Sequence, residues 1–273
     1  MKFSLLVVCL NPGEKLKHTL ESALMQDYKD YEIIIKDGGS KDGSVEEIPG
    51  LFPDAPIRIF AEPDKGIYDA MNQAVSYATG EYVFFLNCGD RFHDGQVLSG
   101  MACEIDKLSG SAHENGRMIF YGNIYGVKNG VWITPSPRID GFTCYRNVPC
   151  HQACFYDTSL CKEKPFEQKY RIRGDYEQFL WCYFKGGVSF VYVDMPVADY
   201  EGGGYSETKE NLRRSKEEHK EITAIYMTKK QLLLYRVILL LTLAPLRKAL
   251  SESKAFAGVY NKMRSALYHV KNR

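Results

Sequence analysis

The sequence predicts an α/β fold with a mostly parallel central sheet flanked by helices and a helical extension at the C-terminus. Apolar, strand-like runs at 3–10, 31–36, 57–61 and 82–86 alternate with stretches in which apolar residues recur at helical spacing. The first run is almost continuously apolar, as expected for a strand that is covered on both faces. Repeated strand–helix–strand units imply parallel strands joined by right-handed crossovers.

Glycine and proline mark the ends of the elements in the first half. Pro12-Gly13 ends the first strand, and residues 14–25 then show helical periodicity. Asp42-Gly43-Ser44 opens a short helix before the third strand. A longer helix is expected at 67–78, and Thr79-Gly80 follows it as a stop signal.

The pattern is looser after residue 94. Lys128-Asn129-Gly130 predicts a hairpin between two strands. The strands of the second half are expected at 118–125, 131–134, 153–156 and 188–193, and its helices at 97–108, 175–184, 207–227 and 230–244.

The chain of 273 residues is long enough for one full domain and an appendage, which we place at residues 1–206 and 207–273. The net charge of +1 hides an asymmetry, since residues 227–273 hold ten basic side chains and one acid. The remainder has 25 basic and 33 acidic side chains. An acidic body argues against nucleic acid as a ligand, whereas the basic tail suits an anionic surface.

The tail is predicted to lie on a membrane rather than to cross it. The leucine-rich segment 232–246 spans about 15 residues, short of the roughly 20 that cross a bilayer. Basic residues flank it, and segment 256–270 has the pattern of a basic amphipathic helix, which can lie in the lipid interface. The alternative is a helical hairpin that packs on the main domain or on a second copy of the chain, giving a homo-oligomer.

Cysteine use indicates a reducing compartment. The chain has eight cysteines without a Cys-x-x-Cys pair, and Met1-Lys2 leads into a strand rather than into a cleavable apolar helix. We therefore expect free thiols and a cytosolic location. Cys150, His151 and Cys154 lack a second ligand pair at zinc spacing, so zinc is not expected.

Polar clusters follow four of the predicted strands. They contain Asn11, Asp37-Gly38, Asp64 and Asn87-Cys88-Gly89-Asp90. The carboxyl ends of strands in an open α/β sheet form its ligand crevice, so these clusters predict one site for a divalent metal and a phosphate-bearing ligand. Asp90, with Asn87 nearby, is the candidate to hold Mg²⁺ or Mn²⁺.

Each cluster also has a structural interpretation. Asp37 could bind a base or ribose, or its segment could be only a turn in which Asp42 or Ser44 caps the next helix. Asp64 could contact ligand or cap the helix that follows it. Asp69 and Asn72 share one helix face because they are three residues apart, and that face could meet the ligand or solvent.

The motifs together resemble those of family 2 glycosyltransferases. The segment Asp37-Gly-Gly-Ser-Lys-Asp-Gly-Ser, residues 62–72, residues 79–82 and Asn87-Cys-Gly-Asp90 occur in the order and spacing of that family over about residues 3–95. The resemblance implies a GT-A fold, a nucleotide-sugar donor and a divalent metal held by Asp90. Asn87 stands where the family's Asp-x-Asp motif has its first acid, a form similar to that of members that build bacterial polysaccharides.

The resemblance continues more weakly to about residue 206. The segment around Asp175 resembles the acidic motif that supplies the catalytic base of inverting members, with Glu177 as the second candidate. The alternative is that Asp175 caps the following helix. His151-Gln-Ala resembles a His-Gln segment of the polysaccharide-building members. His151 could orient the acceptor or the diphosphate, although a structural histidine fits equally well. Gly203 and Tyr205 lie in a segment that resembles a Gly-Gly-x-Ser loop beside the acceptor.

The resulting expectation is an inverting glycosyltransferase of bacterial surface polysaccharide synthesis. It would move a sugar from a nucleotide-sugar donor to a lipid-linked glycan, and it would act at the cytoplasmic face of the inner membrane as a peripheral protein. A sugar nucleotidyltransferase is one alternative, but residues 10–13 lack the Gly-rich basic loop expected for a triphosphate. An inactive, membrane-tethered scaffold is another, and Asn87 is its support.

Overall fold

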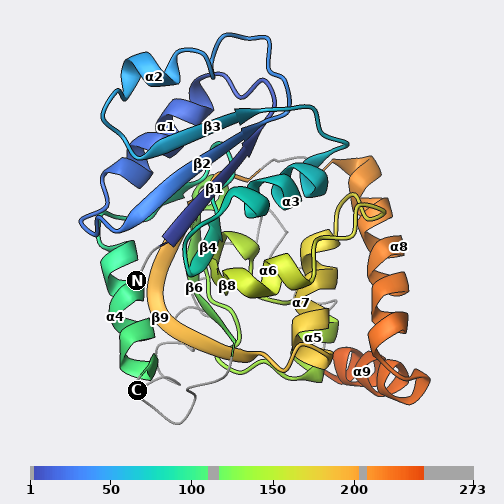
Figure 1. Ribbon diagram of the computed structural model, residues 1–273. Helices are drawn as coiled ribbons and strands as arrows, with labels where there is room; N and C mark the ends of the chain where they lie inside the picture. Colours follow the sequence, from blue (N-terminus) through green and yellow to red (C-terminus); the bar gives the residue numbers. More distant parts are fainter. Residues whose placement is uncertain (1–2, 110–116, 203–207, 243–273) are drawn as a thin grey trace. The chain divides into compact units, whose positions relative to one another are not determined.

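A computed structural model describes residues 3–109, 117–202 and 208–242. These residues form a sheet of nine strands in the order β3-β2-β1-β4-β8-β6-β9-β5, with β7 paired to β6 (Figure 1). The strands are β1 (Phe3–Cys9), β2 (Tyr31–Asp37), β3 (Ile57–Ala61), β4 (Tyr82–Phe85), β5 (Arg91–Phe92), β6 (Met118–Gly126), β7 (Val131–Ile133), β8 (Cys154–Asp157) and β9 (Ser189–Tyr200).

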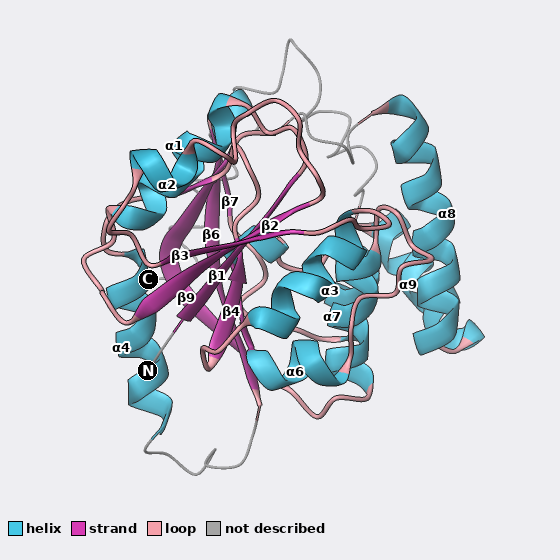
Figure 2. Cartoon of the chain, turned by 45° about the horizontal axis from the view of Figure 1, so that its top comes forward, coloured by secondary structure: helices cyan, strands magenta, loops and turns pink. Residues whose placement is uncertain are grey.

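Helices connect the strands, and the described residues include two more helices after β9 in the sequence. They are α1 (Glu14–Leu24), α2 (Ile48–Leu51), α3 (Ile67–Tyr77), α4 (Val97–Ser109), α5 (Gly141–Arg146), α6 (Thr158–Glu163), α7 (Gly174–Phe184), α8 (Lys209–Tyr226) and α9 (Lys229–Leu241), with short 3₁₀ turns η1 (Val127–Asn129) and η2 (His151–Ala153). Figure 2 shows the sheet nearly edge-on, with α1, α2 and α4 on one side and α3, α6 and α7 on the other.

Alternating side chains of the strands supply two cores, one on each face of the sheet. Leu5 of β1 packs in the core beneath α1 and α4, whereas its neighbour Leu6 packs in the core beneath α3 and α6. Strands buried on both faces need apolar residues at nearly every position, which explains the continuous apolar runs in the sequence. The α/β fold predicted from those runs is confirmed.

The first four strands of the chain, β1 to β4, are all parallel to one another. β1 pairs in parallel with β2 and β4, and β2 pairs in parallel with β3, as the strand–helix alternation predicts. β8 then lies antiparallel between β4 and β6, while β9 runs parallel to β6. The sheet beyond β4 is therefore mixed.

The second half agrees with the predicted hairpin and departs in two places. β6 and β7 form the hairpin at 127–130. β9 is longer than the predicted strand 188–193, because register shifts near Asn123 let it continue along β6 to Tyr200. The short elements α5, α6 and β5 were not predicted, since six residues or fewer show too little periodicity.

The chain divides into two compact units, Met1–His219 and Lys220–Arg273. The first part of α8 thus belongs to the sheet-containing unit, whereas the boundary at 206/207 stays a prediction. In the second unit the N-cap of α9 is Thr228, which forms a capping box with Gln231. Over the described parts of the chain, none of the helices combines the length and apolar character needed to span a bilayer. The predicted helix at 256–270 lies outside the described residues.

Candidate active site

The loops that follow β1 and β2 are joined to each other. Asn11 donates its backbone N–H to Ser40 Oγ (2.8 Å) and accepts from Lys41 N at Oδ1 (2.8 Å). Asn11 has a φ of 48°, a left-handed conformation that asparagine tolerates better than most residues. Asp37 is buried and accepts from the backbone N–H and hydroxyl of Ser40. Both predicted residues therefore lie at the same edge of the sheet, where Asp37 shapes the loop.

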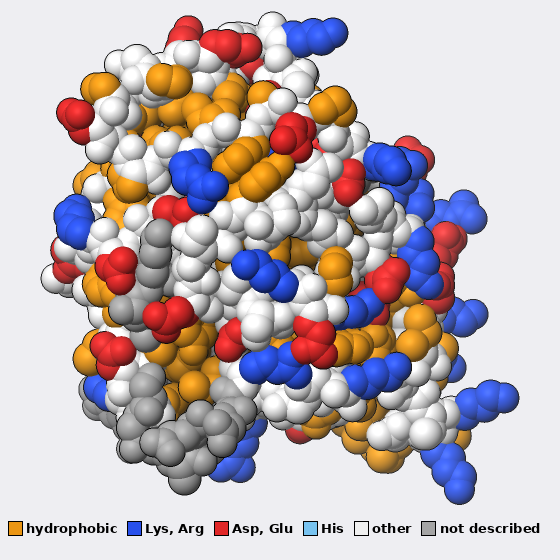
Figure 3. Space-filling view, in the orientation of Figure 1, with side chains coloured by type: hydrophobic (Ala, Val, Ile, Leu, Met, Phe, Trp, Pro, Cys, Tyr) orange, Lys and Arg blue, Asp and Glu red, His pale blue; other side chains and the backbone are white. Residues whose placement is uncertain are grey.

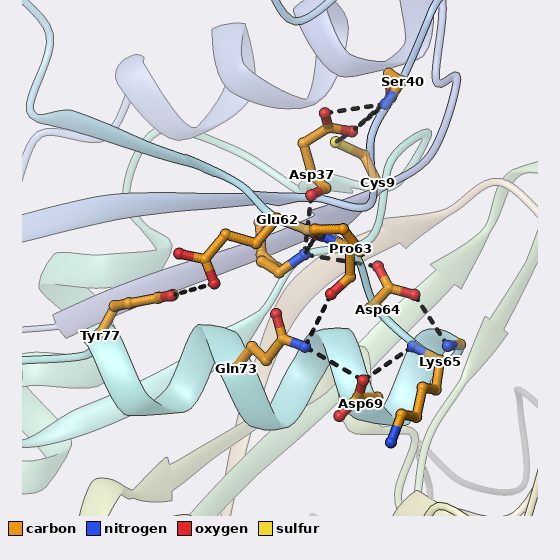
Figure 4. A network of polar contacts seen from close by, with 12 residues as sticks. Cys9, Asp37, Ser40, Glu62, Pro63, Asp64, Lys65, Asp69, Gln73 and Tyr77 are labelled. Carbon is orange, nitrogen blue, oxygen red and sulfur yellow. Dashed lines mark hydrogen bonds and ion pairs between the residues drawn. The ribbon is translucent and has the colours of Figure 1, made fainter.

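A fully buried lysine lies beneath these loops. Lys36 Nζ donates to the carbonyls of Asp37 (2.8 Å) and Glu62 (2.5 Å) and lies 3.6 Å from Asp64 Oδ2. A Cβ at Gly38 would come within 2.6 Å of the same Asp64 oxygen, so this close approach requires glycine. Asp64 also accepts from Gly66 N (2.9 Å), which fixes the entry to α3 (Figure 4).

Two of the predicted donor-site residues, Asp69 and Asn72, form hydrogen bonds with other residues of the protein. Asp69 accepts from Lys65 N and from the side-chain amides of Gln73 and Gln168. Asn72 makes a reciprocal pair of hydrogen bonds with the backbone of Phe166, which ties α3 to the segment after α6. These contacts occupy the polar atoms of both side chains and favour structural roles.

The turn after β4 presents a buried carboxylate. Asp90 is only 4% exposed, and its oxygens accept from Gln152 Nε2 (3.3 Å) and Glu201 N (2.9 Å). Thr19 of α1 holds the turn by accepting from Gly89 N and donating to the Asp90 carbonyl. Burial raises the pKa of the Asp90 carboxyl above its usual range, and the two hydrogen bonds only partly offset this.

A chain of hydrogen bonds connects that turn to α7. Asn87 Nδ2 lies 3.2 Å from His151 Nε2, and His151 Nδ1 lies 3.1 Å from Asp175 Oδ2. The other oxygen of Asp175 accepts from the hydroxyl of Tyr68 (2.9 Å). If the Asn87 amide donates, His151 carries its proton on Nδ1 and donates it to Asp175. Three elements far apart in the sequence thus converge on one carboxylate.

The two carboxyl groups of this site differ in proton affinity. Burial opposes ionisation of Asp175, but the hydrogen bonds from His151 and Tyr68 hold its pKa below the usual range. The Asp175 side chain is still 27% exposed, so a ligand can reach it. Asp90 has a raised pKa and Asp175 a lowered one, and such divergence is typical of sites with distinct roles.

The remaining predicted residues lie elsewhere. Glu177, the second candidate base, is buried and pairs with Lys164 Nζ at 3.3 Å, away from the His151–Asp175 contact. Asp175 itself lies inside α7, whose N-cap is Arg173, so it is not the cap. Gly203 and Tyr205 lie outside the described residues.

The loop before α7 is held by an acid on α8. Glu218 is buried and accepts from the backbone N–H groups of Arg171, Ile172 and Arg173 at 2.9–3.0 Å. Arg173 Nε also donates to the hydroxyl of Ser215 (2.8 Å). These contacts fix the start of the helix that carries Asp175.

Sequence reasoning missed several residues of the site. Lys36 could have been noticed as a charge inside an apolar strand, and Glu218 as an acid in a helix of alternating charges. Tyr68 and Gln152 lie in segments that carried the family resemblance, but neither was singled out as a site residue. No local signal marks Thr19 and Glu201, because each is recognised only by the partner that it contacts in space. The missed residues are Thr19, Lys36, Tyr68, Gln152, Glu201 and Glu218.

The site suits a metal ion that is coordinated mainly by phosphate oxygens of a bound substrate and by water. In residues 3–109, 117–202 and 208–242, no group of three His, Cys, Asp or Glu side chains forms a complete metal site. Mg²⁺ commonly uses one or two carboxylates and completes its coordination with phosphate oxygens and water. The buried Asp90 carboxylate, whose charge is poorly compensated, fits that arrangement.

The fold and the strand-end site define a GT-A-type enzyme architecture. The family model described as "Glycosyl transferase family 2" matches residues 4–154. This is more than half of the chain, which therefore belongs to glycosyl transferase family 2.

Relatives and solved structures agree with this assignment. The PGL/p-HBAD biosynthesis glycosyltransferase of Mycobacterium bovis is 31% identical over 219 residues, which cover 78% of this chain and 83% of the relative. The amylovoran biosynthesis glycosyltransferase AmsB of Erwinia amylovora is 24% identical over 217 residues, or 73% of this chain and 69% of the relative.

Two structures show the same fold at low sequence identity. S. aureus TarS 1–349 in complex with UDP-GlcNAc has a TM-score of 0.64 and 19% identity, covering 82% of this chain and 67% of TarS. The mannosyltransferase PcManGT from Pyrobaculum calidifontis, in complex with GDP-Man and Mn²⁺, has a TM-score of 0.53 and 15% identity, covering 99% and 86%. The predicted GT-A-like fold is confirmed.

Proposed function

We propose that this protein is a metal-dependent, inverting glycosyltransferase that moves a sugar from a nucleotide-sugar donor to a hydroxyl group of a lipid-linked bacterial glycan. The observation that carries the proposal is the partly exposed Asp175 carboxylate, held ionised by His151 and Tyr68 and linked through Asn87 to the Asp90 turn. Such a carboxylate is suited to act as a general base.

The proposed reaction is a single displacement. The acceptor oxygen forms a bond to the anomeric carbon as the bond from that carbon to the diphosphate breaks, and the diphosphate leaves with the electron pair. Asp175 Oδ2 or Oδ1 takes the hydroxyl proton, a contribution of on the order of 10²–10⁴ in rate. Attack from the side opposite the leaving group inverts the anomeric centre.

The remaining residues would bind and orient. The loops at Asn11, Asp37 and Asp64 lie where the nucleoside would sit at the carboxyl ends of β1–β3. Asp90 would hold Mg²⁺ or Mn²⁺, and the bound metal would offset the charge of the leaving diphosphate. His151 would keep Asp175 oriented and ionised.

Similar proteins support the proposed donor and the proposed product. TarS, which has this fold, was solved with UDP and with UDP-GlcNAc, and this supports a nucleotide-sugar donor. The name of AmsB, an amylovoran biosynthesis glycosyltransferase, supports a glycan product.

A lipid-linked acceptor agrees with attachment to the cytoplasmic face of the bacterial inner membrane through α9. Leu233, Leu234, Leu240 and Leu241 of this helix are more than half exposed, and Lys229 and Lys230 lie at its start. Figure 3 shows further Lys and Arg side chains along α8.

Vesicle binding tests the membrane part of the proposal. The full chain should sediment with anionic phosphatidylglycerol vesicles, and the Leu234→Glu/Leu241→Glu variant should not. Leu212→Glu, at an exposed apolar position of α8, is the matched control. Equal sedimentation of all three proteins would contradict membrane attachment through α9.

Ligand-dependent thermal stability tests the donor site. UDP-, GDP- and dTDP-sugars are added with and without Mn²⁺ to the wild type and to Asp90→Asn. We expect one nucleotide class to raise Tm, and we expect this increase to need both Mn²⁺ and Asp90. No increase with any nucleotide sugar would argue against the enzyme and favour the scaffold. An increase that is the same without Mn²⁺ would contradict metal dependence.

A further inference from the structure

A row of aromatic and charged side chains crosses four strands next to the proposed site. Tyr125 on β6 is the direct cross-strand partner of Trp132 on β7 and of Asp199 on β9, and Asp199 is in turn the partner of Arg91 on β5. Directly paired residues project from the same face of a sheet. These four residues and His93, which contacts two of them, are called the Trp132 row.

The Trp132 row is fixed in place yet open to solvent. His93 Nδ1 lies 2.7 Å from Asp199 Oδ1, and its ring meets the Trp132 indole edge-on with 5.2 Å between centroids. The Trp132 and Tyr125 rings lie 5.1 Å apart. Even so, Trp132 is 42% exposed, and the His93 and Asp199 side chains are 28% and 29% exposed.

The Trp132 row lies on the same face of the sheet as the catalytic candidates. Phe92, Ile124 and Ala198, which alternate with members of the row along β5, β6 and β9, are buried in the core beneath α1 and α4. The row must therefore project from the opposite face, on which α3 and α7 carry Tyr68 and Asp175.

The row is also close to Asp90 along two strands. Arg91 follows Asp90 directly, and Glu201, which donates its N–H to Asp90, lies two residues after Asp199. At about 3.3 Å per residue, two residues of extended chain separate these groups by only about 7 Å. An acceptor whose reacting hydroxyl is near Asp175 would thus have this surface within reach of its neighbouring sugar.

We propose that the Trp132 row binds a sugar ring of the acceptor glycan. A pyranose has an apolar C–H face and a rim of hydroxyl groups. The exposed indole of Trp132 offers a flat apolar surface to the first, and Asp199, His93 and Arg91 offer hydrogen-bonding groups to the second. That the bound sugar belongs to an acceptor rests on the proposed function, whereas sugar binding itself does not.

Intrinsic fluorescence tests sugar binding directly. The chain has two tryptophans, so Trp181→Phe leaves Trp132 as the single reporter. The probes are methyl α- and β-glycosides of glucose, galactose, N-acetylglucosamine and rhamnose. We expect a saturable change in emission with at least one glycoside. Asp199→Asn should weaken that binding at least tenfold, whereas Ile133→Ala, next to Trp132 but on the other face, should leave it within twofold.

A second measurement does not depend on the reporter. Saturation-transfer NMR with the same glycosides should lose its signal in Trp132→Ala and keep it in Trp132→Phe, because phenylalanine preserves a flat apolar ring. Matching circular dichroism spectra and Tm values would show that both variants are folded.

The outcomes separate this inference from the proposed function. No saturable change with any glycoside, or binding that is unaltered in Asp199→Asn and Trp132→Ala, would overturn sugar binding by the Trp132 row. Glycoside binding in a protein that no nucleotide sugar stabilises would support the row and count against the transferase.

Discussion

Two buried carboxylates, at opposite ends of the parallel strands, have opposite proton affinities. Glu32 lies at the amino end of β2, and its oxygens accept from Ser4 Oγ (2.8 Å), from the N–H and hydroxyl of Thr79 (2.8 and 2.6 Å) and from Arg58 Nη1 (2.9 Å). Burial opposes ionisation, but these donors lower the pKa of Glu32 from 4.5 to about 2. Asp90, at the carboxyl end, has fewer donors and a raised pKa.

The amino ends of the strands are therefore arranged for stability and the carboxyl ends for ligand binding. The four donors around Glu32 come from β1, from β3 and from Thr79, which lies between α3 and β4. One carboxylate therefore holds the amino ends of these strands together. Asp90 is buried without comparable compensation, which costs stability and leaves a carboxylate that a cation can stabilise. The comparison predicts that changes at one end affect folding and changes at the other affect catalysis.

The largest effect on catalysis is expected for Asp175→Asn. Loss of the general base should lower kcat by on the order of 10²–10⁴. Transfer to an acceptor is the measurement, and Glu177→Gln is the control, because Glu177 pairs with Lys164 inside the protein. If Glu177→Gln were inactive and Asp175→Asn remained active, our assignment of the general base would be reversed.

Asp90→Asn is expected to separate activity from stability. Activity with metal should fall about a hundredfold, since one preorganised electrostatic contact at such a site contributes on that scale. Because burial raises the pKa of Asp90, its ionised form costs stability above the usual carboxyl range, and the amide removes this cost. The free energy of unfolding at pH 7 should therefore stay equal or rise. A clear loss of stability would show that Asp90 resembles Glu32 after all.

Glu32→Gln should show the reverse pattern. We expect about 2 kcal/mol lower unfolding free energy at pH 7, with unchanged kcat. The lowered pKa stabilises the fold above 4.5 and this contribution is lost as the pH falls toward about 2, so the difference from the wild type should vanish there. Urea unfolding at several pH values measures it. Arg58→Ala, which removes only the 45% exposed partner, should cost at most about 1 kcal/mol.

The smallest effect is expected for His151→Gln. The histidine lowers the pKa of Asp175, so its loss should raise that pKa and move the acid limb of the kcat profile to higher pH, with about a tenfold lower kcat at neutral pH. A pH profile of kcat is the measurement, and His18→Gln, at an exposed position of α1, is the control. An unmoved acid limb would contradict the positioning role of His151.

The sequence predicted the sheet better than the site. β1 to β4 were found within a residue or two of their ends, because strands buried on both faces leave continuous apolar runs. Asp37, Asp64 and Asp90 were placed at the correct edge because parallel strands end there together. Asp69 and Asn72, also predicted as ligand contacts, are hydrogen-bonded to Gln168 and Phe166, almost a hundred residues away.

The α/β alternation, the strand ends and the acids that lie there follow from the local sequence, since periodicity and turn residues act over a few neighbours. The roles of those acids depend on contacts between distant parts of the chain. Tyr68, His151 and Asp175 meet through three separate elements, and Glu32 and Asp90 acquire opposite pKa shifts from donors on other strands. Hydrogen bonding and desolvation depend on which groups meet in space, and the local sequence does not contain that information.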